Sequence, residues 1–197
     1  MYTKPVGKIS YIFNHEGIRT IFVNFRYPIC LAFLILILPQ IKPEFLLPGF
    51  LVSLFGELIQ VWCFASLDKN RSLAVRGPYS LTRNPMYIGR FFLLLGGVLL
   101  IGEIWIIPVF IMIYYFYLTN RVRREETNLH VIFQEEYQSY CSKVNRFVPS
   151  FKRVNLKPLF YFNWRLFLQN NGNWNLSGVL IIYLLFYFIT FIKTGAQ

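Results

Sequence analysis

The stretch FLLPGFLVSLFGELIQVWCFASL, residues 45–67, decides the fold. It exceeds the roughly 20 apolar residues that a helix needs to cross the ~30 Å hydrocarbon core of a bilayer. Comparable apolar stretches occupy residues 86–101, 104–119 and 176–192, and a shorter one, Tyr27–Leu38, precedes them. A run as short as Tyr27–Leu38 is also typical of a re-entrant segment or a signal core. Counting it as a span, we predict an all-α membrane protein with about five transmembrane helices.

The composition agrees with a membrane protein. Apolar residues make up 55% of the 197-residue chain, aromatic residues 19% and charged residues 15%, whereas soluble proteins average about 45–50% apolar and 25% charged. The length suits one domain, and the spans leave no room for a separate soluble catalytic domain. We therefore expect one membrane-embedded domain over residues 1–197. It comprises the first two spans (1–67), a catalytic core with a helical hairpin (68–149), and an interfacial segment with the last span (150–197).

The net charge of +11 is distributed unevenly along the chain. In a five-span arrangement only Lys42 and Lys193 fall on one side, and the other lysines and arginines fall on the opposite side. Because cytoplasmic loops are rich in lysine and arginine, this asymmetry predicts that the catalytic region faces the cytoplasm of a bacterial inner membrane or the endoplasmic reticulum. A basic face also attracts anionic lipid, so the charge does not call for a nucleic-acid partner. The cysteines, Cys30, Cys63 and Cys141, are odd in number and lack zinc-site spacing, so we expect neither disulfides nor a metal.

A polar turn, RGPYSLTRNPMYIG at residues 76–89, separates two of the apolar stretches. The chain is predicted to leave the bilayer, to turn at Gly77 and Pro78, and to begin a helix at Pro85, because proline suits the first helical position. A helix start presents unpaired backbone amides and a positive partial charge, which favour a carboxylate ligand. The turn is therefore a candidate ligand site.

A second polar cluster, RVRREETNLHVIFQEEYQSYCSKVNRFVP, occupies residues 121–149. Here the fourth span is predicted to continue as one amphipathic helix, because apolar side chains recur every three or four residues at Leu129, Phe133, Tyr137 and Tyr140. Arg121 and Glu125 fall one turn apart on the same face. Two polar clusters that flank one apolar hairpin can share a pocket.

Together the two clusters resemble the membrane methyltransferases of the isoprenylcysteine carboxyl methyltransferase and phospholipid methyltransferase group. The family pattern is GPY, then R[HN]PMY with a following Gly, a Glu pair, FGEEY and RF.P. The corresponding residues here are Gly77, Pro78, Tyr79; Arg83, Asn84, Pro85, Met86, Tyr87, Gly89; Glu125, Glu126; Phe133, Gln134, Glu135, Glu136, Tyr137; and Arg146, Phe147, Pro149. The chain departs from the pattern at Asn84, where many members have His, and at Gln134, where Gly is usual. Neither change removes a charge, so we interpret both as bearing on substrate choice.

The resemblance implies S-adenosylmethionine as methyl donor and a lipid or prenyl-lipid acceptor in the bilayer. It implies Arg83, Arg121 and Glu125 as catalytic residues, with Arg121 facing the acceptor. The residues that it places against the cofactor are Arg71, Ser72, Leu73, Ala74, Tyr79, Asn84, Pro85, Met86, Tyr87 and Glu125.

The residue types agree with these roles. Methyl transfer is a direct displacement, so the protein mainly aligns the two reactants. The donor carries a sulfonium, an ammonium and a carboxylate, which call for aromatic faces, a carboxylate and guanidinium donors. Tyr79, Tyr87, Glu125 and Arg83 supply these groups. A guanidinium such as Arg121 can also hold a carboxylate or phosphate through two parallel hydrogen bonds.

The methyl acceptor stays open at this stage. An α-carboxylate has a pKa of about 3.3–3.7 and needs no base, whereas an amine near 10.4 must first lose a proton. An amine acceptor would require Glu125, Glu126, His130 or a tyrosine as general base. The alternatives are a phospholipid N-methyltransferase, an NADPH-dependent sterol-type reductase, which needs a basic site for the 2′-phosphate, and a non-enzymatic lipid-binding scaffold.

Several polar residues also have a purely structural interpretation. The arginines suit positive-inside anchors, and Glu135, Glu136 and His130 suit an exposed face. Glu57 and Gln60 lie within the stretch at 45–67, where a carboxylate is a functional hypothesis by default unless it lies near the far interface. Residues 156–168 are typical of an interfacial helix.

Overall fold

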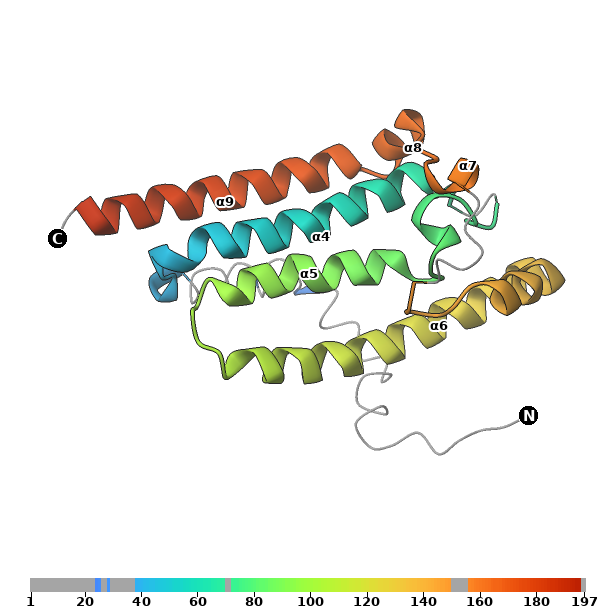
Figure 1. The fold of residues 1–197 in the computed structure, drawn as a ribbon, viewed down its shortest axis with the longest axis horizontal. Helices are drawn as coiled ribbons and strands as arrows, with labels where there is room; N and C mark the ends of the chain where they lie inside the picture. Colours follow the sequence, from blue (N-terminus) through green and yellow to red (C-terminus); the bar gives the residue numbers. More distant parts are fainter. Residues whose placement is uncertain (1–23, 26–27, 29–37, 70–71, 150–155, 196–197) are drawn as a thin grey trace.

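The computed structural model describes residues 24–25, 28, 38–69, 72–149 and 156–195 (Figure 1). Within these ranges the chain forms helices and no strand, as predicted. The predicted span Tyr27–Leu38 falls almost entirely outside them, and so does Arg71. The long helices are α4 (Leu46–Ser66), α5 (Pro85–Leu99), α6 (Ile106–Lys143) and α9 (Gly172–Gly195), and the short ones are α7 (Leu156–Leu159), α8 (Trp164–Gln169) and the 3-10 turns η1 (Leu38–Gln40), η2 (Pro43–Phe45) and η3 (Gly77–Ser80).

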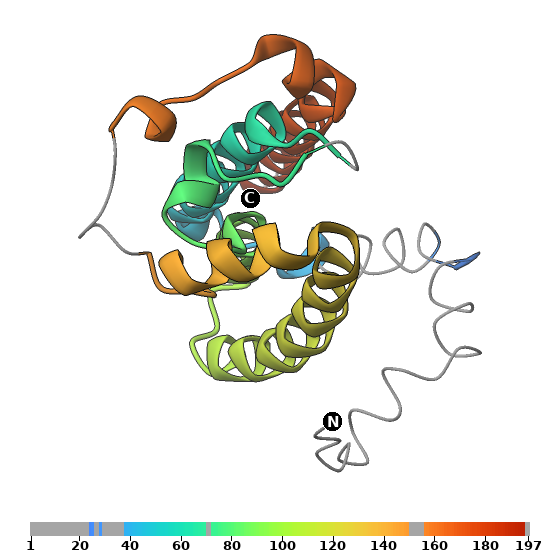
Figure 2. The same cartoon turned by 90° about the vertical axis from the view of Figure 1, so that its right-hand side faces the viewer.

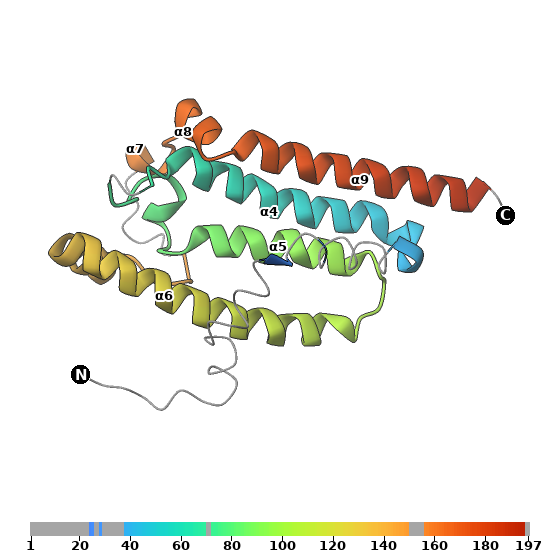
Figure 3. The same cartoon turned by 180° about the vertical axis from the view of Figure 1, so that it is seen from behind.

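The four long helices lie side by side in the order α9, α4, α5, α6, seen from the front in Figure 1 and from behind in Figure 3. Among the described residues, two helical segments are long and apolar enough to cross a membrane, Pro43–Ser66 and Gly172–Lys193. These two correspond to the predicted spans at 45–67 and 176–192. Helix α5 is apolar but shorter, with 15 residues. The count of five spans stays a prediction.

Helices α4 and α5 pack backbone against backbone. A Cβ atom on Gly89 would lie 2.7 Å from the carbonyl oxygen of Gly56, and one on Gly96 would meet the backbone of Gly49 and Ser53. Small residues at such contacts let two helices approach closely, which is a common way to pair helices in membranes. This contact fixes the start of α5, and with it the polar turn, beside the last turns of α4.

Helices α4 and α9 are joined instead by polar side chains. The Glu57 side chain is fully buried, and the Asn175 amide nitrogen lies 3.1 Å from each of its carboxylate oxygens. Gln60 donates to Glu57 Oε2 at 3.2 Å. Tyr183 on α9 adds a hydrogen bond to the Gly49 carbonyl at 3.0 Å. Glu57 thus lies inside the helix bundle as a contact between α4 and α9.

The predicted hairpin between α5 and α6 turns at Gly102, whose φ of +68° is a conformation that glycine adopts without steric cost. Lys42, which precedes α4, forms an ion pair with Glu103 at 2.8 Å and closes this end of the bundle. Lys193 reaches the same end, where its ammonium donates to the Pro39 carbonyl at 3.1 Å. Lys42 and Lys193, which were predicted to lie on the same side of the membrane, thus lie at the same end of the helix bundle.

Helix α6 is not the single continuous helix that its periodicity predicts. Gln134 has φ +39° and ψ −114°, which is not helical, so α6 consists of a first arm (residues 106–133) and a second arm (residues 135–143). Figure 2 shows the second arm folding back at a steep angle to the first. Gln134 is exposed and occupies the position where the family pattern has glycine. Glycine adopts positive φ angles without steric cost. The bend therefore explains why the family pattern has a glycine at this position.

Candidate functional site

A cavity of about 520 Å³ lies where the two polar clusters meet. It is bounded by the end of α4, the segment leading to η3, the start of α5 and both arms of α6. Its lining includes nine of the predicted site residues: Ser72, Leu73, Ala74, Tyr79, Arg83, Asn84, Met86, Tyr87 and Glu125. Pro85 begins α5 beside them. The structure thus brings together segments that are far apart in the sequence, from Phe64 at the end of α4 to Tyr140 in the second arm of α6.

Arg121 does not line the cavity, but it contacts two residues that do. Its Nε atom lies 3.0 Å from Glu125 Oε1 and donates a hydrogen bond to the Tyr87 hydroxyl at 3.3 Å. Arg121 and Glu125 are each about half exposed, so their charges can reach a ligand from outside the fold. Arg121 and Glu125 lie one turn apart on the same face of α6, as predicted, and they form an ion pair there.

Glu126, the other member of the glutamate pair, is buried with 8% of its surface exposed. Its Oε1 atom accepts a hydrogen bond from the Asn84 amide at 3.1 Å and lies 3.5 Å from Arg83 Nη1. Its Oε2 atom accepts from Arg146 Nε at 2.8 Å, and these hydrogen bonds raise the pKa of the Arg146 guanidinium above its usual value. Glu126 therefore joins the turn at Arg83, Asn84 and Pro85 (the RNP turn), the first arm of α6 and the chain after the second arm.

From the sequence, Glu126 was predicted only as a possible general base, and Arg146 was not predicted as a site residue. The signal was present, because Arg146 opens the RF.P element of the family pattern and Glu126 belongs to the glutamate pair. Two further hydrogen bonds support the same junction: the Arg83 backbone N–H donates to the Asn145 carbonyl at 2.8 Å, and the Asn84 side-chain amide donates to the Arg146 carbonyl at 3.2 Å.

The second arm of α6 supplies two further lining residues, Tyr137 and Tyr140. The Tyr140 hydroxyl donates to the Tyr79 carbonyl at 2.6 Å. Burial raises the pKa of both the Tyr79 and Tyr140 phenols, so both stay protonated at neutral pH. Tyr79 and Tyr140 therefore line the cavity with uncharged side chains, and the Tyr140 hydroxyl serves as a hydrogen-bond donor.

Two buried polar atoms of the cavity lining, Arg83 Nε and Tyr137 Oη, have no hydrogen-bond partner among the described residues. Buried polar groups are nearly always paired, so these two donors are available to polar groups of a ligand or to water. An N–H and an O–H donor suit a carboxylate. Together with the Glu125 carboxylate and the faces of Tyr79 and Tyr87, they suit a ligand that carries both a carboxylate and a positive charge.

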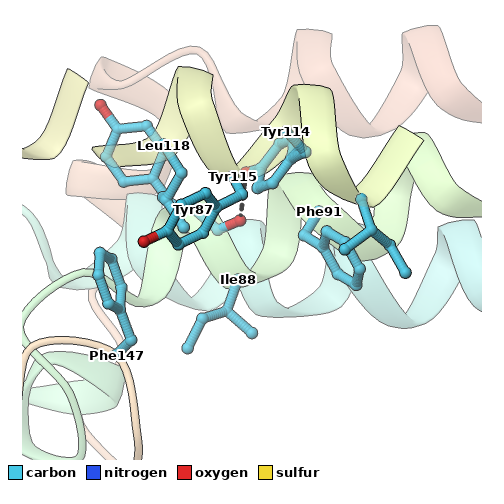
Figure 4. Close-up of a pocket in the computed structure, with 8 residues that line it drawn as sticks. Tyr87, Ile88, Phe91, Tyr114, Tyr115, Leu118 and Phe147 are labelled. Carbon is cyan, nitrogen blue, oxygen red and sulfur yellow. Dashed lines mark hydrogen bonds between the residues drawn. The ribbon is translucent and has the colours of Figure 1, made fainter. Parts of the chain in front are cut away.

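A second, smaller hollow of about 220 Å³ lies between α5 and the first arm of α6 (Figure 4). Its labelled lining is almost wholly apolar or aromatic: Tyr87, Ile88, Phe91, Tyr114, Tyr115, Leu118 and Phe147. Tyr87 lines this apolar groove and the polar cavity alike. The Tyr114 hydroxyl donates to the Tyr87 carbonyl at 2.6 Å, which fixes the backbone of this shared residue.

The residues assigned to an exposed face lie there, since Glu135, Glu136 and His130 are exposed. The described residues contain no cluster of three or more His, Cys, Asp or Glu that could hold a metal ion.

Comparison with known proteins gives a consistent picture. The family model for phospholipid methyltransferase matches residues 49–136. Three relatives bear the name protein-S-isoprenylcysteine O-methyltransferase. The protein of Xenopus laevis is 25% identical over 122 residues (56% of this chain and 42% of the relative). Those of Saccharomyces cerevisiae and Schizosaccharomyces pombe are 32% and 29% identical over 82 residues, which are 42% of this chain and 34% and 35% of the relatives.

The matched region thus covers less than half the length of each of these relatives. No solved structure matches the chain at a comparable level of significance. The matched region contains the RNP turn, α5, the glutamate pair and the bend of α6. The resemblance predicted from the motifs is thereby confirmed: residues 49–136, which make up less than half of the chain, match the phospholipid methyltransferase family, and the three relatives are named isoprenylcysteine O-methyltransferases.

Proposed function

We propose that the protein is an enzyme that transfers a methyl group from S-adenosylmethionine to a lipid or prenyl-lipid acceptor. The observation that carries this proposal is the cavity, in which an aromatic pair, a carboxylate and partnerless donors converge from separate segments. The family match over residues 49–136 supports the same chemistry.

The cofactor would occupy the polar cavity. Arg83 Nε and Tyr137 Oη would bind its carboxylate, and Glu125 would attract its positive groups. Tyr79 and Tyr87 offer aromatic faces, which attract cations. S-adenosylmethionine supplies a methyl group on a positively charged sulfur, and the chain's own residues hold and orient the reactants.

The acceptor would approach Tyr87 from the other side. Its apolar tail suits the groove between α5 and α6, and its anionic head would be held by Arg121, which already donates to the Tyr87 hydroxyl. A carboxylate acceptor is ionised at neutral pH and needs no base, as in the reaction named for the three relatives. The description of the family model keeps phospholipid methylation as the second candidate.

We place the site at the cytoplasmic face of a membrane that the chain crosses several times. Two helical segments of sufficient length and apolarity support this topology, as does the grouping of Lys42 and Lys193 at the end opposite the cavity. The proposed total of about five spans counts the predicted segment at residues 27–38 as one of them.

Calorimetric titration of the detergent-purified protein with S-adenosylhomocysteine tests the cofactor assignment. Wild-type protein should bind it, and Glu125→Ala should weaken binding at least tenfold, because the variant loses the carboxylate in the cavity. Glu135→Ala is the matched control, since Glu135 is exposed outside the lining, and should bind as wild type does. Binding of reduced nicotinamide cofactor instead would move the protein to the reductases.

Transfer of a radiolabelled methyl group then distinguishes the acceptors. We expect transfer to a farnesylcysteine analogue, and Arg121→Ala should raise the KM for this acceptor more than it lowers kcat. Transfer to phosphatidylethanolamine vesicles with none to the prenylcysteine would assign the second candidate. Transfer to neither would contradict the proposed reaction.

A further inference from the structure

A group of exposed aromatic side chains surrounds the connection between α7 and α9. We call residues 160–170, which include α8, the aromatic elbow. Trp164 is 64% exposed, and Trp174 just beyond the elbow is 73% exposed. The Trp164 ring contacts the rings of Phe162 and Phe167, with centroids 6.0 and 5.0 Å away. Contiguous exposed apolar surface of this kind marks a binding surface.

We infer that the aromatic elbow lies in the headgroup layer of the bilayer, at the mouth of the polar cavity. Tryptophan and tyrosine are enriched at both membrane–water interfaces, where an apolar ring and a polar group are satisfied together. Helix α9, which follows the elbow in the chain, also has exposed apolar side chains, which include Ile181, Leu184 and Phe188. A lipid partner covers both surfaces at once.

Hydrogen bonds fix the elbow to the last turns of α4. Asn170 donates from its side chain to the carbonyls of Phe64 and Leu67, at 2.9 and 2.7 Å, and the Asn163 N–H donates to the Ala65 carbonyl at 3.0 Å. The last carbonyls of a helix have no partner within it, so the elbow satisfies this end of α4. Trp62 adds a bond to the Tyr161 carbonyl at 3.2 Å.

This attachment also places the elbow at the rim of the cavity, because Phe64 and Leu67 line it. Figure 1 shows α8 above the end of α4 that is nearest to the polar turn. The depth of the elbow in the membrane therefore sets the depth of the cavity mouth.

The opposite end of the bundle has a second exposed aromatic, Trp105, which is 65% exposed in the α5–α6 hairpin. The Lys42–Glu103 ion pair holds this hairpin beside the start of α4. Helix α4 has 21 residues, which at 1.5 Å per residue is about 31 Å. A hydrocarbon core is about 30 Å thick, so the two aromatic sites are separated by the distance between the two interfaces of one bilayer.

Basic side chains accompany the elbow. Arg165 is exposed on α8, and the Arg76 guanidinium stacks over the Tyr161 ring at 5.4 Å. Anionic headgroups attract arginines close to the surface, by about 1 kcal/mol each. Aromatic rings with flanking arginines fit a phospholipid headgroup layer.

Tryptophan fluorescence in lipid vesicles tests the inference. The chain has four tryptophans, Trp62, Trp105, Trp164 and Trp174. A variant that keeps Trp164 alone, with phenylalanine at the other three positions, is reconstituted into phosphatidylcholine and phosphatidylglycerol. We expect quenching by lipids brominated near the ester end of the acyl chain, weaker quenching by lipids brominated near the methyl end, and little quenching by aqueous iodide.

A variant that keeps only Trp62 is the control, because Trp62 is partly buried beneath the elbow and should respond to neither quencher strongly. Strong iodide quenching of Trp164 without lipid quenching would overturn the inference and assign the surface to a soluble partner.

A second measurement needs no substitution. A photoactivatable phospholipid with its reactive group next to the headgroup should label the peptide over residues 160–170 of wild-type protein, and absence of label there would equally contradict the inference. Neither readout involves methyl transfer, so this inference and the proposed function can fail separately.

Discussion

Two buried carboxylates, Glu57 and Glu126, show how the same side chain serves two halves of the molecule differently. Glu57 lies between α4 and α9, and within the described part of the chain its side-chain hydrogen bonds come from the neutral amides of Asn175 and Gln60. Glu126 lies beside the cavity, where the guanidiniums of Arg83 and Arg146 and one amide contact it. The amide of Asn175 joins α9 to α4 at Glu57. The guanidiniums of Arg83 and Arg146 join separate segments of the chain at Glu126, beside the cavity.

The difference has an energetic meaning. Removing one member of a buried ion pair strands a charge and costs about 3–5 kcal/mol. Hydrogen bonds between membrane helices contribute about 0.6 kcal/mol on average and about 1.7 at most. The two glutamates should therefore differ in what their removal does to stability and to ligand binding.

The largest effect is expected for Glu126→Leu. Arg83 and Arg146 would lose their shared partner, so the free energy of unfolding should fall by about 3 kcal/mol, and S-adenosylhomocysteine binding should be lost. Thermal unfolding in detergent and calorimetric titration measure the two quantities. Glu125→Leu is the matched control, and it should lose binding with a much smaller loss of stability, because Glu125 is half exposed. Equal stability losses in the two variants would remove the contrast.

Glu57→Leu should have an intermediate effect. Asn175 and Gln60 would both lose an acceptor, so the free energy of unfolding should fall by about 1–2 kcal/mol while S-adenosylhomocysteine binds with unchanged affinity. Glu57→Gln keeps an acceptor oxygen and should stay closer to wild type in the same thermal assay. A loss of cofactor binding in Glu57→Leu would show that this carboxylate serves the site after all.

The smallest effect, of opposite sign, is expected for Gln134→Gly. A non-glycine residue at this φ is strained, and relief of the strain should raise the free energy of unfolding by about 1 kcal/mol. The bend brings Arg146 toward Glu126. The variant should therefore stabilise the surroundings of Glu126 and leave those of Glu57 unchanged. Gln134→Ala keeps the Cβ atom and should show no gain. An equal gain for alanine would rule out backbone strain as the cause.

The sequence was sufficient to predict the parts of the fold that depend on local pattern. Helix α4 begins and ends one residue inside the predicted stretch, and the hairpin at Gly102 forms as expected. The bend at Gln134 could not be predicted, because apolar side chains keep helical spacing from Leu129 to Tyr140 straight across it. The spacing of apolar side chains does not reveal that the backbone angles of a single residue are not helical.

The candidate site was predictable in membership more than in arrangement. The family resemblance named nine of the residues that line the cavity. They did not separate the roles of Glu125 and Glu126, because adjacent residues on a helix face different directions, and only the packed structure shows which one is buried. The partner of Glu57 was equally hidden, since Asn175 is 118 positions away in the chain.

The short helix α5 has a mechanical consequence for the surrounding lipid. Its 15 residues reach about 22 Å, well short of a typical hydrocarbon core, and its contact at Gly89 prevents it from sliding along α4. Lipids beside such a helix must compress or leave polar groups exposed, at a cost that rises with each ångström of mismatch. In the proposed membrane topology the bilayer would therefore be thinnest beside α5, and a bilayer of longer acyl chains would work elastically against this side of the protein.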